Sequence, residues 1–193
     1  MRDQVTDLLR QEILTGKLEE DEAVREIPLA KRFNVSRGPI RDAILQLTQE
    51  GLLRSQPNRG ARVGPLWGPE IRPIMVGMRF EVESFAMGKL MQSETEIDFG
   101  GLRKNLRHFE LACRDEDLGM VVQMDIEFHR LILRLSDVPG LEAVWLPLMG
   151  GMRLPYSRHR KLLESHKEHA AILKAMESGQ ARRALAALKR NIR

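Results

Sequence analysis

Apolar residues recur at helical spacing in the first third of this 193-residue chain. In residues 1–14 they lie three or four positions apart, which predicts an amphipathic helix closed by Gly16. Residues 28–33 carry a second short pattern, and residues 36–50 carry a third that Ser36 can cap at its amino end. The buried stripe of this third helix is expected at Ile40, Ala43, Ile44 and Leu47.

The pattern changes after Gly51. Two short extended runs flank the turn formed by residues 57–60, Pro-Asn-Arg-Gly, which predicts a small β-hairpin. Prolines and glycines then interrupt regular structure between residues 65 and 73. We therefore expect an amino-terminal domain at residues 1–66, a linker at 67–73 and a second domain at 74–193.

The second domain reads as helical throughout. One long apolar stripe is expected to face its core, and further helices are predicted near residues 94–114, 117–136, 139–154, 160–177 and 180–192. The stripe consists of Ile71, Ile74, Met75, Met78, Val82, Phe85, Ala86 and Leu90. The predicted fold class is mainly α: a helix-turn-helix with a small β-hairpin wing, followed by an all-α bundle of about six helices.

The composition limits the cellular compartments in which the protein is expected. An apolar content of 42% is enough for a real core, and the single Cys113 excludes a disulfide framework within the chain. The charged and periodic first residues do not resemble a signal peptide, and no long apolar run predicts a membrane span. We expect a soluble, cytoplasmic protein that has no membrane partner.

Positive charge is concentrated in two short segments. Residues 25–41 contain five cations and one acid, Glu26, and residues 54–62 contain three cations and no acid. Such segments are typical of a footprint for phosphates, although charge alone fits a solvated basic face equally well.

Arg37 and Arg41 lie four residues apart at the start of the third predicted helix, so they project together, opposite its apolar stripe. A short turn followed by a helix with an exposed cationic amino end is the arrangement that enters the DNA major groove. Arginine suits bidentate contact with guanine, and Ser36 suits phosphate. The alternative is a pair of solubilising charges with Asp42 and Glu50 as local partners.

The stretch PLAKRFNVSRGPIRDAILQLTQEGLLRSQPNRGARV resembles the winged helix-turn-helix of GntR-family bacterial repressors. That family typically shows V-S-R-x-P-[VI]-R-[ED]-A-[IL], then E-G-L-[VL], then N-R-G-[AG]-x-V. Gly38 stands where the family often has Thr. The resemblance implies double-stranded operator DNA as the partner, with contacts from Ser36, Arg37, Pro39, Arg41, Arg59 and Gly60.

Two acid or imidazole motifs in the second domain place polar groups on apolar faces. In MDIEFHRLIL, Asp125 and His129 are four apart on the side that also carries Phe128 and Ile132, and in SHKEHAAILKAM, His169 shares a face with apolar residues. Buried polar groups need each other, water or a ligand. Inward carboxylate and imidazole groups suit a divalent ion, but satisfied core histidines explain the pattern equally well.

The D-x-x-F-H and E-H-x-x-[IL] motifs are similar to the all-helical effector domain, called FCD, of FadR-like GntR regulators. The resemblance implies a divalent metal ion, zinc, nickel or manganese, on Asp125, His129 and His169. The family's fourth ligand is a histidine, and Asn191 stands at that position. Either water or effector completes the metal shell, or metal affinity is low. Arg79 matches an arginine that can bind a carboxylate effector, and its alternative is a salt bridge.

These observations predict a homodimeric transcriptional regulator, a repressor, whose operator affinity responds to a small organic acid bound in the helical domain. Residues 65–73 would act as the hinge. Two other functions stay open at this point: a metal-dependent hydrolase, and an architectural DNA-binding dimer without an effector.

Overall fold

The computed structural model describes residues 2–56, 60–65, 67–150 and 162–192. Contacts among them divide the chain into two compact units. The first unit contains the residues up to Pro69 together with the end of one helix from Leu146, and the second contains the other residues from Glu70 onward. The boundary after Pro69 lies in the segment that the sequence suggested as a linker.

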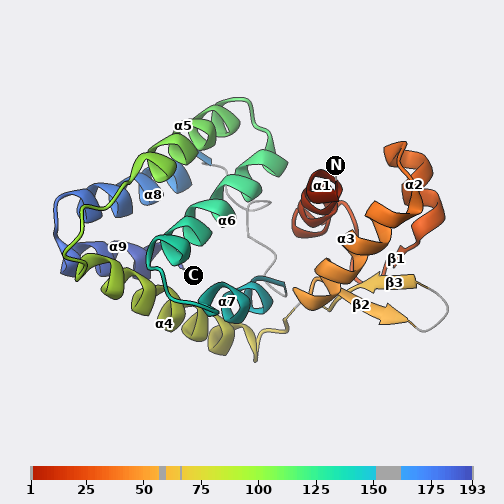
Figure 1. Ribbon diagram of the computed structural model, residues 1–193, viewed down its shortest axis with the longest axis horizontal. Helices are drawn as coiled ribbons and strands as arrows, with labels where there is room; N and C mark the ends of the chain where they lie inside the picture. The colour runs from red at the N-terminus through yellow and green to blue at the C-terminus, as the bar shows by residue number, and fades with distance from the viewer. Residues whose placement is uncertain (1, 57–59, 66, 151–161, 193) are drawn as a thin grey trace. The chain divides into compact units, whose positions relative to one another are not determined.

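The first unit is built from three helices and three short strands among its described residues (Figure 1). The helices are α1 (Arg2–Leu14), α2 (Glu26–Phe33) and α3 (Arg37–Gln49), and the strands are β1 (Ala23–Val24), β2 (Leu53–Gln56) and β3 (Gly60–Val63). The predicted helix-turn-helix with a β-hairpin is confirmed.

The hairpin is part of a three-stranded antiparallel sheet with the order β1, β3, β2. β1 pairs Val24 with Ala61, and β2 pairs Leu53 with Val63. The sequence did not predict β1, because two residues are too short to show an alternating pattern. Gly60 has a φ of 86°, and a side chain there would come within 2.8 Å of the Val24 carbonyl oxygen, so glycine is required at the start of β3.

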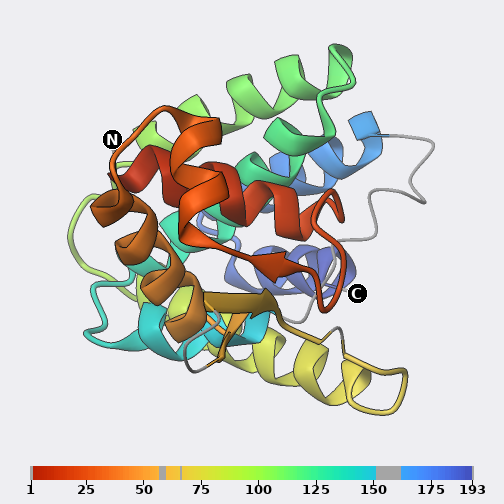
Figure 2. The ribbon, with the colours of Figure 1, turned by 90° about the vertical axis from the view of Figure 1, so that its right-hand side faces the viewer.

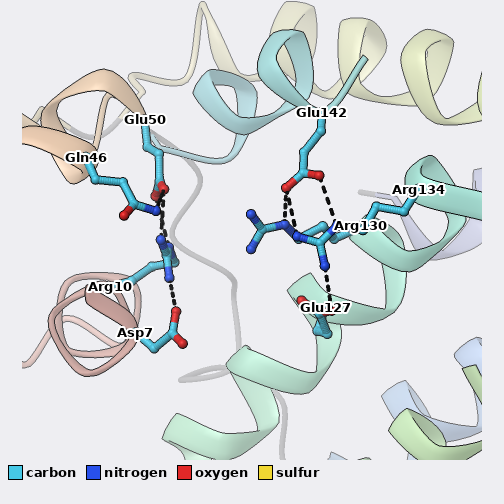
Figure 3. Close-up of polar contacts among 8 residues, drawn as sticks. All are labelled: Asp7, Arg10, Gln46, Glu50, Glu127, Arg130, Arg134 and Glu142. Atoms are coloured by element: carbon cyan, nitrogen blue, oxygen red, sulfur yellow. Dashed lines mark hydrogen bonds and ion pairs between the residues drawn. The ribbon is translucent and has the colours of Figure 1, made fainter. Parts of the chain in front are cut away.

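The core of the first unit lies between α1 and α3, which lie beside each other in both views (Figure 1, Figure 2). Leu9, Ile40 and Leu47 are fully buried there. Arg10 of α1 reaches the end of α3, where its Nε and Nη2 atoms donate to the two oxygens of Glu50 at 3.0 and 2.8 Å (Figure 3). Glu50, suggested by the sequence as a local partner of the exposed arginines, therefore binds Arg10 instead.

Helix α2 begins two residues earlier than the sequence predicted, at Glu26 rather than at Pro28. An acidic residue is favourable in the first helical turn, and Pro28 is still early enough in the helix to lose no hydrogen bond. The helix ends at Asn34, whose left-handed backbone, with φ of 52°, turns the chain toward α3. Glu26 is thereby placed in regular structure at the start of the helix-turn-helix.

Among the residues that the structure describes, the second unit contains five complete helices and the first half of a sixth, α7. They are α4 (Arg72–Met91), α5 (Gly100–Arg114), α6 (Leu118–Leu135), α7 (Leu141–Gly150), α8 (Leu162–Glu177) and α9 (Ala181–Asn191). Helix α5 begins at Gly100, later than predicted; its N-cap is Phe99, and the preceding Asp98 accepts a hydrogen bond from the Gly100 amide at 2.7 Å. No described helix has both the length and the apolar character that crossing a membrane requires.

Five of these helices close into a ring, because α4 packs on α6, α6 on α5, α5 on α8, α8 on α9, and α9 on α4. Phe109, Phe128 and Trp145 are the largest fully buried side chains. Helix α7 is joined to α6 by Glu142, which binds both Arg130 and Arg134 (Figure 3). Every helix of the ring can therefore direct side chains toward a shared interior.

The predicted core stripe on α4 is wrong in part. Ile74, Met78 and Phe85 are exposed, and the buried face contains Arg79 and Glu83 together with Ala86, Met87 and Leu90. Arg79 and Glu83 pair with each other inside the unit, so a polar pair occupies positions that hydrophobic periodicity assigns to the surface.

Candidate DNA-binding surface and metal centre

The amino end of α3 presents the predicted DNA-binding residues on one exposed surface. Ser36 is the N-cap, with extended backbone, and its hydroxyl makes no capping hydrogen bond. The side chains of Arg37 and Arg41 are 59% and 65% exposed, whereas Ile40 between them is fully buried. Pro39 is half-buried in the first turn. The helix therefore divides as the sequence predicted, with its core on one side and cations on the other.

The two arginines share one carboxylate. Nη2 of Arg37 lies 2.9 Å from Oε2 of Glu26, and Nε of Arg41 lies 3.1 Å from Oε1. The hydrogen bonds from Arg41 and Arg37 lower the pKa of Glu26, which stays ionised. We name Glu26, Arg37 and Arg41 the surface cluster.

The sequence analysis missed the role of Glu26, although one signal was present. It is the single acid among the residues from Arg25 to Arg41, and it opens the helix that precedes the turn. Its carboxylate binds both guanidinium groups and so brings them together at the amino end of α3.

In the wing, too, an acidic side chain partly neutralises two arginines. Arg54 of β2 and Arg62 of β3 both bind Asp21, and Nη1 of Arg62 also donates to the Asp21 backbone oxygen at 2.5 Å. Gly60 lies at the start of β3, whereas Arg59 lies outside the described residues. Among the described residues of the wing, Arg54 and Arg62 are thus both held at the sheet by one acid, Asp21.

In the second unit, the structure brings together three of the four predicted metal ligands. Asp125 and His129 come from α6, and His169 comes from α8. All three side chains are buried, and each offers a ligand atom within 4.8 Å of the others. Oδ1 of Asp125 lies 3.9 Å from Nε2 of His129, and Oδ2 lies 3.4 Å from Nε2 of His169.

The other nitrogen of each imidazole has a close partner. Nδ1 of His129 lies 2.6 Å from Oε2 of Glu83, and Nδ1 of His169 lies 2.8 Å from the backbone oxygen of Ser165. Within the described parts of the chain, neither Nε2 atom makes a hydrogen bond. A satisfied core histidine would use both nitrogens, so this arrangement favours a ligand at Nε2.

The electrostatics of Asp125 and His129 suit a cation. Burial by itself would raise the pKa of Asp125, but the adjacent His169 and His129 bring that pKa well below its usual range. Burial lowers the pKa of His129 and favours its neutral ring. An ionised carboxylate and neutral imidazoles are the forms that bind metal ions.

The three ligand atoms also lie close enough together, within 4.8 Å of one another, for a single divalent ion to be shared by all three side chains. Two imidazole nitrogens and one carboxylate oxygen leave further coordination positions for water or a small molecule.

Asn191, the fourth ligand implied by the family motif, lies beside His169. Its amide nitrogen is 3.4 Å from Nδ1 of His169 and 3.4 Å from Oε2 of Glu168. It therefore approaches His169 at the nitrogen that also pairs with Ser165.

Arg79 lies in the interior beside the candidate metal centre. It is 3% exposed, and its Nε donates to Oε1 of Glu83 at 2.7 Å. Trp145 of α7 donates from Nε1 to the same oxygen at 2.7 Å. Burial would raise the pKa of Glu83, but Arg79 and His129 beside it lower that pKa to about 2. We name Arg79, Glu83, His129 and Trp145 the buried cluster.

The sequence analysis missed Glu83 and Trp145. The spacing of Arg79 and Glu83, four apart on a helix, was a usable signal for an ion pair, but nothing local indicated that the pair is buried. Trp145 comes from a helix more than 50 residues later, so only the fold could place it there.

Comparison with known proteins identifies both units. Residues 1–63 match the family model described as bacterial regulatory proteins, gntR family, and residues 75–193 match the FCD domain. The chain belongs to the GntR family of regulators and carries an FCD domain. This regulator thus combines the head and the effector domain that its sequence motifs resembled.

Among curated relatives, the regulator is 27% identical over 134 residues to the HTH-type transcriptional repressor RspR of Escherichia coli K12. It is 29% identical over 168 residues to the gluconate operon transcriptional repressor of Bacillus subtilis 168. These alignments cover 69% and 86% of this chain, but 58% and 68% of the relatives. The regulator thus spans less than two thirds of the length of RspR.

Solved structures share the fold. The regulator matches E. coli McbR/YncC with a TM-score of 0.78 and 21% identity, over 99% of this chain and 92% of that one. It matches a GntR regulator from Rhodococcus sp. RHA1 with a TM-score of 0.73 and 20% identity, over 99% of this chain and 93% of that one.

Proposed function

We propose that this regulator is a cytoplasmic transcriptional repressor that binds operator DNA through α3 and the wing. The observation that carries the proposal is the surface cluster, which presents Arg37 and Arg41 together at the exposed amino end of α3. The relatives named as transcriptional repressors support the same function.

In this proposal the amino end of α3 enters the major groove. Arg37 and Arg41 contact base edges, with guanine O6 and N7 as the best acceptors for arginine. Ser36 and the free amide groups of the first turn bind phosphate, and Pro39 packs against the backbone of the duplex. The wing residues Arg59 and Gly60 follow the neighbouring backbone or minor groove.

The repressor acts as a homodimer in this proposal. A single α3 reads only a few base pairs, so a site of useful length needs two heads on a palindromic operator. The centres of the half-sites are then about 34 Å apart, or a multiple of that distance.

The second unit is proposed to hold a divalent ion on Asp125, His129 and His169, with zinc, nickel or manganese as candidates. The ion would supply open coordination positions for the oxygen atoms of a small carboxylate effector. Arg79 lies close enough to influence Asp125 electrostatically and is the candidate partner for the effector's negative charge. The effector changes DNA affinity only if it binds one arrangement of the dimer better than another, by about 1–3 kcal/mol in typical cases.

The site does not provide what a metal-dependent hydrolase needs. Such an enzyme needs a general base beside the ion, and the nearby Glu83 already accepts from Arg79 and Trp145 and has its pKa lowered to about 2. The relatives are named as repressors and not as enzymes. An architectural dimer would bind DNA but would respond neither to metals nor to carboxylates.

Selection of bound duplexes from a randomised DNA pool tests the first part of the proposal. We expect a palindromic sequence whose affinity falls steeply with salt. Failure to enrich any sequence would overturn the repressor function.

Titration of the metal-free protein with zinc, nickel and manganese, followed by small carboxylates, tests the second part. We expect a metal to raise the melting temperature and a carboxylate to change operator affinity only when metal is present. DNA binding without either response would leave the architectural dimer.

A further inference from the structure

We infer that Glu83 is the positioning residue of the metal centre: it fixes the tautomer of His129 so that Nε2 presents a lone pair toward Asp125 and His169. The inference rests on the metal centre proposed above, and it assigns a role to a residue outside the ligand motifs. It is carried by the contacts of one buried carboxylate.

The first step concerns the direction of the hydrogen bond. Arg79 is a permanent cation and Trp145 can only donate, and both bind Oε1 of Glu83, so this carboxylate accepts through its oxygens. Oε2 lies 2.6 Å from Nδ1 of His129, and Nδ1 must therefore carry the proton. In the neutral ring Nε2 then has a lone pair, which is the form required of a metal ligand.

The backbone orients the His169 ring in a comparable way. Its Nδ1 lies 2.8 Å from the backbone oxygen of Ser165, and a carbonyl oxygen can only accept. When this ring is neutral, its Nε2 also presents a lone pair. The two imidazoles and the Asp125 carboxylate thus offer three acceptors to one another, an arrangement that a cation stabilises.

The next step concerns what holds Glu83 itself. Arg79 and Trp145 both donate to Oε1 at 2.7 Å, from the same helix and from α7 respectively. These donors leave Oε2 directed at His129, with the side chain of Glu83 only 1% exposed. The carboxylate therefore cannot turn toward water, and its contact with His129 is set before the ion binds.

Replacing Glu83 by glutamine separates this role from simple packing, because the two side chains have nearly the same shape. The glutamine carbonyl would go to Arg79 and Trp145, which can only donate there, and the amide NH₂ would face Nδ1 of His129. Nδ1 would then accept, the proton would move to Nε2, and Nε2 could no longer bind a metal without losing that proton.

The experiment measures the tautomers of the metal-free protein by ¹⁵N NMR of labelled histidines, and the zinc affinity by calorimetry. In wild type we expect His129 protonated at Nδ1. In Glu83→Gln we expect the Nε2-protonated form and zinc affinity about 10- to 100-fold weaker.

Glu12→Gln is the matched control. Glu12 is another buried acid, bound to Arg32 and Lys17 in the first unit, so its loss tests the general effect of removing a buried charge. It should change neither the His129 tautomer nor the zinc affinity by more than about threefold.

Two results would overturn the inference: Nε2 protonation of His129 in neutral wild type, or unchanged zinc affinity in a folded Glu83→Gln protein. If wild type binds no divalent ion at all, the metal centre fails, while the tautomer still decides the role of Glu83. If Glu83→Gln does not fold, the wild-type tautomer alone provides the test.

Discussion

Glu26 and Glu83 each bind several donors through one carboxylate, but Glu26 does so at the surface of the first unit and Glu83 in the interior of the second. In the surface cluster the carboxylate side chain is 23% exposed, and its two arginines are more than half exposed. In the buried cluster the side chains of Glu83 and His129 are at most 1% exposed.

This difference in exposure matches two different roles. The surface cluster suits the binding of a partner, and the buried cluster suits a fixed ligand geometry. Water and salt weaken the surface ion pairs, so Arg37 and Arg41 can exchange Glu26 for phosphate or a base edge at little cost. In the interior no solvent replaces a lost partner, so each donor of the buried cluster depends on Glu83. Similar chemistry therefore suits DNA recognition in one unit and a fixed ligand geometry in the other.

Truncating Glu83 should produce the largest effect. Glu83→Ala leaves Arg79 without its Nε partner and Trp145 without an acceptor, and we expect the free energy of unfolding to fall by about 3–5 kcal/mol. Urea denaturation, followed at the unfolding transition of the FCD domain, measures this loss of free energy. A loss of unfolding free energy below about 1 kcal/mol would mean that removing the buried carboxylate costs no more than breaking the exposed ion pairs of the surface cluster.

Removing the metal should come next. At a free metal concentration of 100 times Kd, the ion stabilises the folded protein by about 2.7 kcal/mol, so a chelator should lower the melting temperature of wild type. His129→Ala should melt at the same temperature with and without chelator. Equal melting of wild type under both conditions would remove the metal from the regulator's function.

Breaking the surface cluster on its cationic side should affect DNA binding rather than stability. Arg41→Ala should weaken operator binding roughly 10- to 100-fold in a gel-shift titration at fixed salt, because it would remove the proposed base contact. Arg103→Ala is the control, since Arg103 is an exposed arginine of the second unit that pairs with Glu177. Equal operator affinity of Arg41→Ala and wild type would exclude α3 as the reading helix.

The smallest effect is expected from Glu26 itself. Because the folded pKa of Glu26 is below its ordinary value of 4.5, its ion pairs contribute stability above that value and lose it as the pH falls through the folded pKa. Glu26→Gln should therefore cost less than about 1 kcal/mol at pH 7 and a smaller amount at pH 2. Thermal melts of Glu26→Gln and wild type at both pH values measure this cost. A larger cost at pH 2 than at pH 7 would contradict the expected direction.

The sequence by itself determined the features that depend on spacing along one helix. Arg37 and Arg41 share a face because they are four apart, and so do Asp125 and His129, since the α-helical repeat converts that spacing into proximity. The turn at Asn34 and the glycine at the start of β3 were also predictable, because local backbone chemistry specifies them.

Only the tertiary structure decided the partners from distant segments. It brought His169 to Asp125, Trp145 to Glu83 and Glu26 to the arginines of α3. It also turned α4 so that Arg79 and Glu83, not Ile74 and Met78, face the interior. A sequence pattern records which residues share a face, but helix packing selects which face is buried, and a buried ion pair can reverse the choice that hydrophobicity predicts.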